Sequence, residues 1–274
     1  MIDPAPSIFV FCALACEAKP LIDTWKLKKL AQPAMPFSLY RNATRVVVIS
    51  GIGKVAMAGA VAFTLASFKL ERLPILLNLG IAGHYHADLG TLFLAHKIID
   101  SETARPFFPQ LPFAVPCATH SIKTYSKPCT DYETDALFEM EAAGFYEMAV
   151  KFSSRELIQV VKIISDNVES SLASINEATV YAAINTHLSI LETLIEQLIG
   201  LQRSASIDAI TRDSHSFSKQ YHLSVSNGLK LTALLQRWLL LKGNIFDYTQ
   251  APSGTAKELI RWLEVELEKT DFYL

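Results

Sequence analysis

The chain has 274 residues, of which 50% are hydrophobic and 19% are charged. This composition excludes an intrinsically disordered chain and allows one large domain, alone or with an accessory unit. Lys and Arg total 25 and Asp and Glu total 27, so net charge does not indicate a nucleic acid or a membrane surface as partner.

Four scattered cysteines indicate reduced thiols. The closest pair, Cys12 and Cys16, has no matching Cys or His pair at zinc-site spacing. The first apolar run, residues 8–15, is too short to span a bilayer, and no basic segment precedes it. We therefore predict a cytoplasmic protein without a membrane segment.

The first part of the chain predicts strands and a helix in turn. Residues 8–14 are continuously apolar, which is typical of a strand buried on both faces. Residues 38–41 and 45–50 predict a hairpin. The glycine turn 51–54 leads into an Ala-rich helix at residues 55–69.

The alternation continues through the middle of the chain. Residues 73–80 predict a second buried strand, which ends in a glycine turn at 80–83. Residues 91–100 predict a further strand. The proline-rich stretch 106–116 predicts a rigid loop, and regular structure resumes near 121–125.

A helix at residues 135–152 and a strand at 157–164 complete this part, and the polar residues 165–167 predict a turn. Strands that alternate with helices predict an α/β fold, in which helices flank a mixed or parallel sheet.

The composition changes after residue 167 to that of helices. Residues 173–202 predict one long helix, because neither Gly nor Pro interrupts them before Gly200. A polar link at 204–219 leads to predicted helices at 223–242 and 255–269.

These patterns divide the chain near residue 170. We predict an α/β domain at residues 1–170 and an all-helical extension at 171–274, packed on that domain or on a partner subunit. An alternative is that the extension is a docking site for another protein.

Polar residues stand where ligands of open α/β sheets gather, after the buried strands. Glu17 follows the first strand and Asp166 follows the last one. Glu141 lies at the start of a predicted helix, whose N-terminus favours negative charge. We expect these carboxylates to share one crevice, although each alone is more often a cap or a surface charge. The turn at 51–54 lacks the spacing of a phosphate-binding P-loop.

Five segments of the chain carry a family pattern together. They read Ala13-Leu-Ala-Cys-Glu17, Ser50-Gly-Ile-Gly-Lys-Val55, Asn78-Leu-Gly-Ile-Ala-Gly83, Glu139-Met-Glu-Ala-Ala143 and Ile164-Ser-Asp166. In sequence and order they resemble the nucleoside phosphorylase superfamily, and within it most closely the methylthioadenosine/S-adenosylhomocysteine nucleosidases. The resemblance covers about residues 7–167.

The resemblance implies a role for each carboxylate. Asp166 would protonate the departing purine, Glu17 would orient the attacking water, and Glu141 would accept the 2′ and 3′ hydroxyls of the ribose. Such a division fits the chemistry, because an oxocarbenium-like state needs a proton on the leaving group and negative charge near the sugar. The resemblance further implies substrate-binding residues at Met140, Ser165, Ile81, Ala82 and Gly83, and a phosphate or water pocket at Gly51 and Gly53.

The choice between hydrolysis and phosphorolysis rests on one stretch. The phosphorylases generally place an arginine just before the glycine turn that matches Gly80, whereas residues 77–79 here contain no basic residue. We therefore predict a purine nucleoside, or a related ribosyl compound, as the substrate of a hydrolase. The alternatives are a phosphorylase that uses inorganic phosphate, and a nucleoside-binding or regulatory protein with little catalysis.

The chain also departs from the family pattern. Ile81 replaces a small polar residue, Thr91 replaces an acid, and the stretch between Asp100 and Ser121 is shorter than in the family. Lys162 stands where many relatives carry arginine. The pair His84 and His86 lacks a third ligand nearby in the sequence, so we predict neither a metal nor another cofactor. The resemblance also implies a homo-oligomer, because proteins of this family form dimers or larger assemblies.

Overall fold

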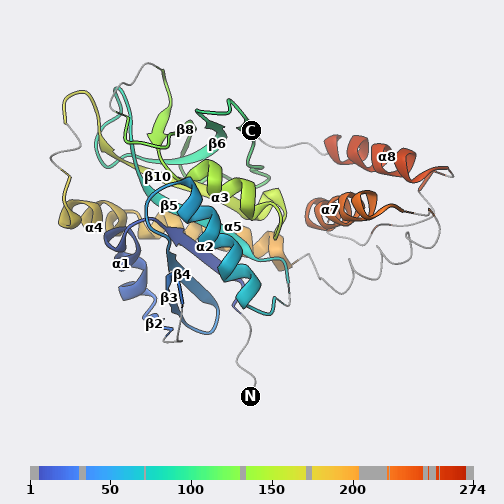
Figure 1. Cartoon of the computed structure of the whole chain (residues 1–274), viewed down its shortest axis with the longest axis horizontal. Coiled ribbons are helices and arrows are strands. Elements are labelled where there is room, and N and C mark those ends of the chain that lie inside the picture. The colour runs from blue at the N-terminus through green and yellow to red at the C-terminus, as the bar shows by residue number, and fades with distance from the viewer. Residues whose placement is uncertain are drawn as a thin grey trace.

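The computed structural model describes residues 6–30, 35–70, 72–129, 134–170, 175–203, 221, 223–242, 246, 251–252 and 254–269. The predicted polar link at 204–219 lies outside them. Figure 1 shows a central sheet with helices against it, followed by the helical C-terminal part.

The strands form one mixed sheet. They are β1 (Ile8–Cys12), β2 (Lys28–Lys29), β3 (Ser38–Arg41), β4 (Arg45–Ile49), β5 (Ile75–Gly83), β6 (Leu92–Asp100), β7 (Pro106–Phe107), β8 (Ala118–Thr124), β9 (Leu137–Glu139) and β10 (Ile158–Asp166). The order is β10-β6-β8-β9-β5-β1-β4-β3-β2, and β7 pairs with β6. Since β10 also pairs with β5, the strands β5, β9, β8, β6 and β10 form a closed circuit.

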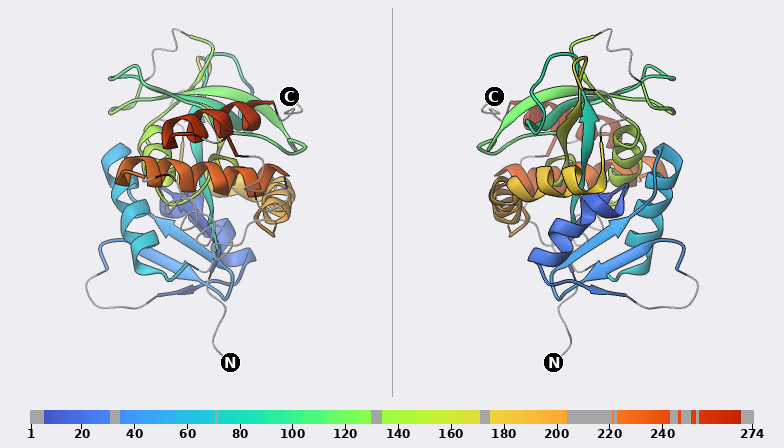
Figure 2. Two further views of the ribbon diagram at one scale, coloured as in Figure 1. Left: turned by 90° about the vertical axis from the view of Figure 1, so that its right-hand side faces the viewer. Right: turned by 90° about the vertical axis from the view of Figure 1, so that its left-hand side faces the viewer.

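The helices cover both faces of this sheet. They are α1 (Ala15–Thr24), α2 (Lys54–Ser67), α3 (Ala142–Ala149), α4 (Glu177–Thr186), α5 (Leu188–Arg203), α7 (Val225–Lys242) and α8 (Ala256–Glu268), with a short 3-10 turn η1 (Arg155–Leu157). One apolar core joins the sheet to α1, α4 and α5, and a second joins it to α2 and α3. Two opposite views show the two sets of helices (Figure 2). The predicted α/β fold is confirmed.

The buried runs explain the centre of the sheet. Every residue of β1 is buried, and β1 pairs in parallel with both β4 and β5. A strand covered on both faces needs no polar alternation, so its sequence is apolar throughout. The predicted hairpin is confirmed as β3 and β4, which pair in antiparallel register.

Two predicted turns are in fact strand ends. Residues 80–83 continue β5, because β10 pairs with them from Gly80 to Gly83. Ser165 and Asp166, predicted as a turn, are the last residues of β10. The predicted loop at 106–116 also contains the two-residue strand β7.

Two predicted helices have other bounds. Residues 137–139, expected in a helix, form β9 between β8 and β5, and the helix α3 begins only at Ala142. The long helix expected at 173–202 is two helices that meet at His187. The Nε2–H of His187 donates to the carbonyl of Gly90 at 2.6 Å, so a tertiary contact stands where the helix is interrupted.

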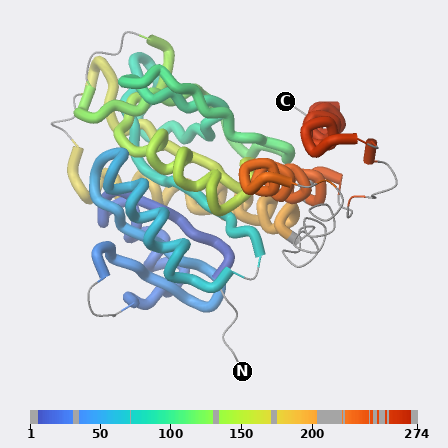
Figure 3. Tube along the Cα trace, turned by 45° about the vertical axis from the view of Figure 1, so that its right-hand side comes forward, coloured from blue at the N-terminus to red at the C-terminus, as the bar shows by residue number. Residues whose placement is uncertain are grey.

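The helices α7 and α8 have a small core of their own. They lie side by side at one edge of the molecule, in orange and red in Figure 3. Trp238 and Trp262 stack between them with ring centroids 6.2 Å apart. Arg237 joins α7 to the main body through an ion pair of 2.8 Å with Glu156. The predicted division near residue 170 stays a prediction. Beyond that residue, α4 and α5 share an apolar core with the sheet.

None of the helices formed by the described residues combines the length and the apolar character that crossing a membrane requires.

Gly144 allows a close approach between two helices. A Cβ atom at this position of α3 would lie 2.3 Å from the carbonyl oxygen of Lys54, where α2 begins. We expect Gly144→Ala to lower the free energy of unfolding by about 1–3 kcal/mol, because the backbones would have to separate. Urea denaturation measures this.

Gly200→Ala in α5 is the matched control, since no atom outside the adjoining backbone of α5 lies within 4 Å of its Cβ position. There alanine should raise stability by about 0.5–1 kcal/mol. Equal effects at both positions would contradict the packing argument.

Candidate active site

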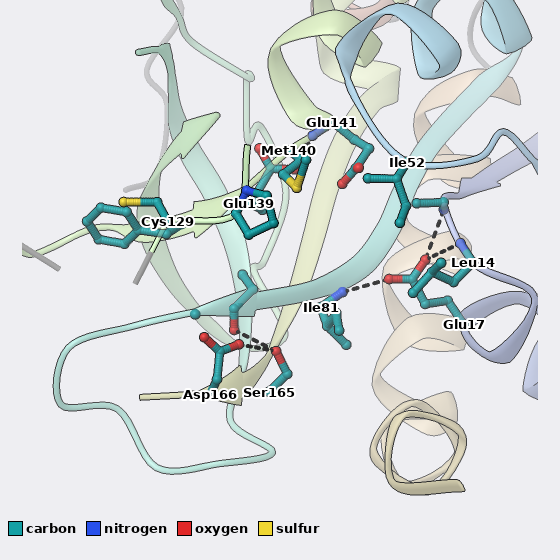
Figure 4. Close-up of a pocket in the computed structure, with 15 residues that line it drawn as sticks. Leu14, Glu17, Ile52, Ile81, Cys129, Glu139, Met140, Glu141, Ser165 and Asp166 are labelled. Atoms are coloured by element: carbon teal, nitrogen blue, oxygen red, sulfur yellow. Dashed lines mark hydrogen bonds between the residues drawn. The ribbon is translucent and has the colours of Figure 1, made fainter. Parts of the chain in front are cut away.

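A cavity of about 190 Å³ lies where β1, β5 and β10 end, opposite the start of α3 (Figure 4). Its wall consists of Ala13, Leu14, Glu17, Ile52, Ile81, Ala82, Gly83, Pro128, Cys129, Phe138, Glu139, Met140, Glu141, Ser165 and Asp166. The wall includes the three predicted carboxylates and the five other residues predicted to bind substrate. Gly51 and Gly53, although described, do not line it.

Asp166 ends β10 inside the cavity. Asp166 is 2% exposed, and the Ser165 hydroxyl donates a hydrogen bond to its Oδ1 at 2.6 Å. The pairing of β10 with β5 shifts register between Ile164 and Asp166. Such an irregularity re-aims a side chain at a strand end. Its carbonyl accepts a hydrogen bond from the N–H of His84 at 3.0 Å, which fixes the backbone there.

Glu17 is held by backbone groups of two strand ends. Its Oε2 accepts from the N–H groups of Ala13 at 2.9 Å and Leu14 at 2.8 Å, and its Oε1 accepts from the N–H of Ile81 at 3.1 Å. Figure 4 shows these bonds converging on the carboxylate. A carboxylate has about four acceptor sites. One site, on Oε1, therefore remains for a water molecule.

Burial governs the acidity of Glu17. It raises the pKa of this carboxyl, whereas the Lys162 ammonium and the three backbone N–H groups act to lower it. The same donors that position Glu17 thus also stabilise its ionised form.

Glu141 precedes the first residue of α3 and faces the glycine turn. Its Oε1 accepts from the N–H of Gly53 at 2.8 Å. Gly51 has φ of +82° and Gly53 has φ of +101°, a region that side chains rarely adopt. The predicted phosphate or water turn therefore supports the Glu141 carboxylate from outside the cavity wall.

Burial raises the pKa of Glu141 from 4.5 to about 7; Lys162 opposes this effect and Glu139 adds to it. Because the folded-state pKa is raised, the stability that this group contributes is complete below pH 4.5 and is lost as pH rises through 7. The difference between the two pKa values corresponds to about 3 kcal/mol.

We expect Glu141→Gln to abolish that part of the pH dependence, since Gln keeps an oxygen for the Gly53 N–H and does not titrate. Urea denaturation from pH 4 to 8 measures it. Glu196→Gln, an exposed change on α5, should keep the wild-type slope. An unchanged slope in Glu141→Gln would contradict the assignment.

Sequence reasoning left Glu139 and Lys162 without a role. The Lys162 ammonium lies 2.9 Å from Oε2 of Glu139, and each side chain is 1% exposed. The sequence does contain a hint of their position. Lys162 and Ile164 precede Asp166 at a spacing of two residues on one strand, and Glu139 precedes Glu141 by two residues. The sequence does not show that both side chains are buried, and burial is the reason that the two charges pair.

A cluster of His84, His120 and Asp135 lies beyond the end of β5. Their ligand-type atoms lie within 4.8 Å of one another. However, Nδ1 of His84 accepts from the N–H groups of His86 and Ala87, at 3.1 and 2.9 Å. This leaves the proton on Nε2, which donates to Asp135. A metal at Nε2 would require those two backbone bonds to break.

The described cavity wall contains neither Lys nor Arg. Its charged residues are Glu17, Glu139, Glu141 and Asp166. An inorganic anion would meet carboxylates there without a cationic side chain in the wall.

Neither a protein-family model nor a curated protein sequence matches the chain. Solved structures do match. A 5′-methylthioadenosine/S-adenosylhomocysteine nucleosidase from Colwellia psychrerythraea, in complex with adenine, is 20% identical with a TM-score of 0.58, and the match covers 72% of this chain and 98% of that one.

Two proteins of Helicobacter pylori match similarly. A 5′-methylthioadenosine/S-adenosylhomocysteine nucleosidase is 16% identical with a TM-score of 0.57, over 70% of this chain and 98% of that one. A futalosine hydrolase is 15% identical with a TM-score of 0.54, over 70% of this chain and 99% of that one. The protein therefore has the fold of the nucleosidases that its five sequence segments resemble.

Proposed function

We propose that the protein hydrolyses the N-ribosidic bond of a purine nucleoside or a related ribosyl compound. The observation that carries the proposal is the meeting of Glu17, Glu141 and Asp166 in one cavity, in a fold shared with nucleosidases. Solved relatives of this fold have adenine or an immucillin bound, which supports a nucleoside-like ligand.

Each carboxylate has a distinct part in the proposed reaction. Asp166 donates a proton to the base as the bond to the sugar breaks, so that the base leaves neutral. Glu141 accepts ribose hydroxyls and places negative charge near the developing oxocarbenium ion. Glu17 uses its remaining acceptor site to orient water toward the anomeric carbon.

Hydrolysis is favoured over phosphorolysis by the charges of the site. Inorganic phosphate needs cationic or amide donors. The described wall offers no cationic side chain, and the nearby Lys162 is paired with Glu139. The N–H of Gly53 is likewise occupied by Glu141.

A substrate panel tests the proposal. The panel includes methylthioadenosine, S-adenosylhomocysteine, futalosine, adenosine and inosine, each with and without inorganic phosphate. We expect free base and free pentose at a rate that phosphate does not change. A sugar phosphate as product would indicate a phosphorylase. If the folded protein turned over none of these compounds, the proposed enzymatic activity would be refuted.

A nucleoside-binding protein with little catalysis is the second candidate. The apolar Ile81 side chain in the cavity wall favours it, since it offers no polar contact to a substrate. Binding without turnover would raise stability by about 2.7 kcal/mol at a ligand concentration of one hundred times Kd. Thermal-shift measurements on the same panel separate it from the enzyme.

A homo-oligomer remains a prediction of the resemblance. Light scattering on the purified protein measures its mass.

A further inference from the structure

Lys162 is a fully buried ammonium beside the proposed site. It lies on β10, pairs across the sheet with Gly80 of β5, and is 1% exposed. A buried lysine without partners would lose its charge. Here burial acts to lower the pKa of Lys162, but Glu139, Glu141 and Glu17 outweigh it and raise the pKa. The ammonium is therefore retained.

Gly80 makes room for two charged groups. A Cβ atom at Gly80 would lie 2.9 Å from Oε1 of Glu17 and 3.3 Å from Nζ of Lys162. Glu17 and Lys162 thus converge over a strand position that has no side chain. Lys162 is not among the residues of the described cavity wall, so its ammonium lies near Glu17 without lining the cavity.

Glu139 links Lys162 to the other side of the cavity. Besides its ion pair, its Oε2 accepts from the N–H groups of Glu141 and Ala142, each at 2.9 Å. Its Oε1 accepts from the hydroxyl of Thr124 at 2.5 Å. The lysine therefore anchors the residue that fixes the backbone of Glu141 at the start of α3.

The charges around this centre come from several elements. They are Glu17 on α1, Glu139 on β9, Glu141 before α3, and Lys162 and Asp166 on β10, while Lys54 at the start of α2 is paired with Asp100 and Glu102. Lys162 thus faces more than one carboxylate with a single positive charge. Removing that charge would make the ionised form of each carboxylate less favourable.

We propose that Lys162 is a positioning residue for the proposed hydrolase, which fixes Glu141 through Glu139 and acts on Glu17 through its nearby charge, in the arrangement and charge state that cleavage requires. The proposal rests on the proposed function for its catalytic consequence. Its physical content, control of the protonation of Glu141, is measurable without any substrate.

The test compares Glu139→Gln with the double variant Glu139→Gln/Lys162→Met. Both lack the Glu139 charge, so they differ only in the ammonium, and neither contains Glu139 as an uncompensated buried charge. The single change Lys162→Met would leave that charge unpaired and is expected to fold poorly. Lys162→Arg is the conservative variant that keeps a cation at this position.

Carbon-13 NMR of protein labelled at glutamate carboxyls gives the first measurement, with the Glu141 signal identified by its loss in Glu141→Gln. We expect the titration midpoint of Glu141 to lie about 1 to 3 pH units higher in the double variant than in Glu139→Gln. In Lys162→Arg it should stay near the wild-type midpoint. Coinciding midpoints in the two matched variants would overturn the proposal.

The second measurement is kcat/KM against pH for the substrate found in the panel. The rising limb should move to higher pH in the double variant relative to Glu139→Gln, and in Lys162→Arg it should stay near that of the wild type. A shifted NMR midpoint with no turnover by wild type would refute the proposed function and keep the role of Lys162 in charge control. Unchanged limbs in an active enzyme would reduce Lys162 to a stabilising ion-pair partner.

Discussion

Asp166→Asn is expected to lower kcat/KM for nucleoside cleavage by about 10²- to 10⁴-fold, the range found when a general acid is removed. Asn has the same size and can still accept the hydrogen bond that the Ser165 hydroxyl gives to Oδ1. It has no carboxyl proton to give to the departing base. Steady-state assays with the best substrate of the panel measure the loss.

Asp23→Asn is the matched control for this change. Asp23 is half-exposed on α1 and pairs with Lys19 on the surface. The same chemical replacement there should leave kcat/KM unchanged and alter stability by less than about 0.5 kcal/mol. If Asp166→Asn retains full activity, the base leaves without the proposed acid.

Glu17→Gln is expected to lower both activity and stability. Gln has only one oxygen, so its NH₂ group would face either the N–H of Ile81 or those of Ala13 and Leu14. A buried N–H without an acceptor costs about 1–3 kcal/mol. Because the acceptor site for water is also on this carboxylate, we expect kcat to fall by at least about 100-fold per folded molecule.

Urea denaturation measures the loss of stability in Glu17→Gln. Active-site titration with a tight ligand gives the concentration of folded sites, so that the loss of kcat is measured separately. Glu147→Gln, an exposed change on α3, controls for the loss of one carboxylate. An active Glu17→Gln protein with reduced stability would restrict Glu17 to holding the strand ends together.

The parts of the fold that were predictable are those with a strong local signal. The strands β1, β5 and β10 are largely buried; β1 is apolar throughout, and β5 and β10 consist mostly of apolar residues, so all three stand out in the sequence. The glycine turn before α2 carries its own signal, since Gly51 and Gly53 adopt positive φ.

The parts that were wrong depend on partners distant in sequence. β9 is three residues long and exists because β8 and β5 flank it. The interruption at His187 stands at a contact with Gly90, 97 residues away in the chain. Neither partner is visible in a local window of sequence.

The candidate site shows the same distinction. Glu17, Glu141 and Asp166 were predicted because the order of five segments resembles a known family. The pair formed by Lys162 and Glu139 was not, because a charge looks alike in sequence whether it is solvated or buried. The fixed orientation of His84 also depends on backbone donors that only the folded loop supplies.

The closed circuit of β5, β9, β8, β6 and β10 bears on how copies of the protein could associate. Strands within the circuit have hydrogen-bonded neighbours on both sides over part of their length, which shortens the edge that they present to another chain. At the open end of the described sheet lies β2, two exposed lysines long, which is a poor template for strand addition. Both features disfavour edge-to-edge pairing of sheets, so assembly of several copies would use mainly helix and loop surfaces.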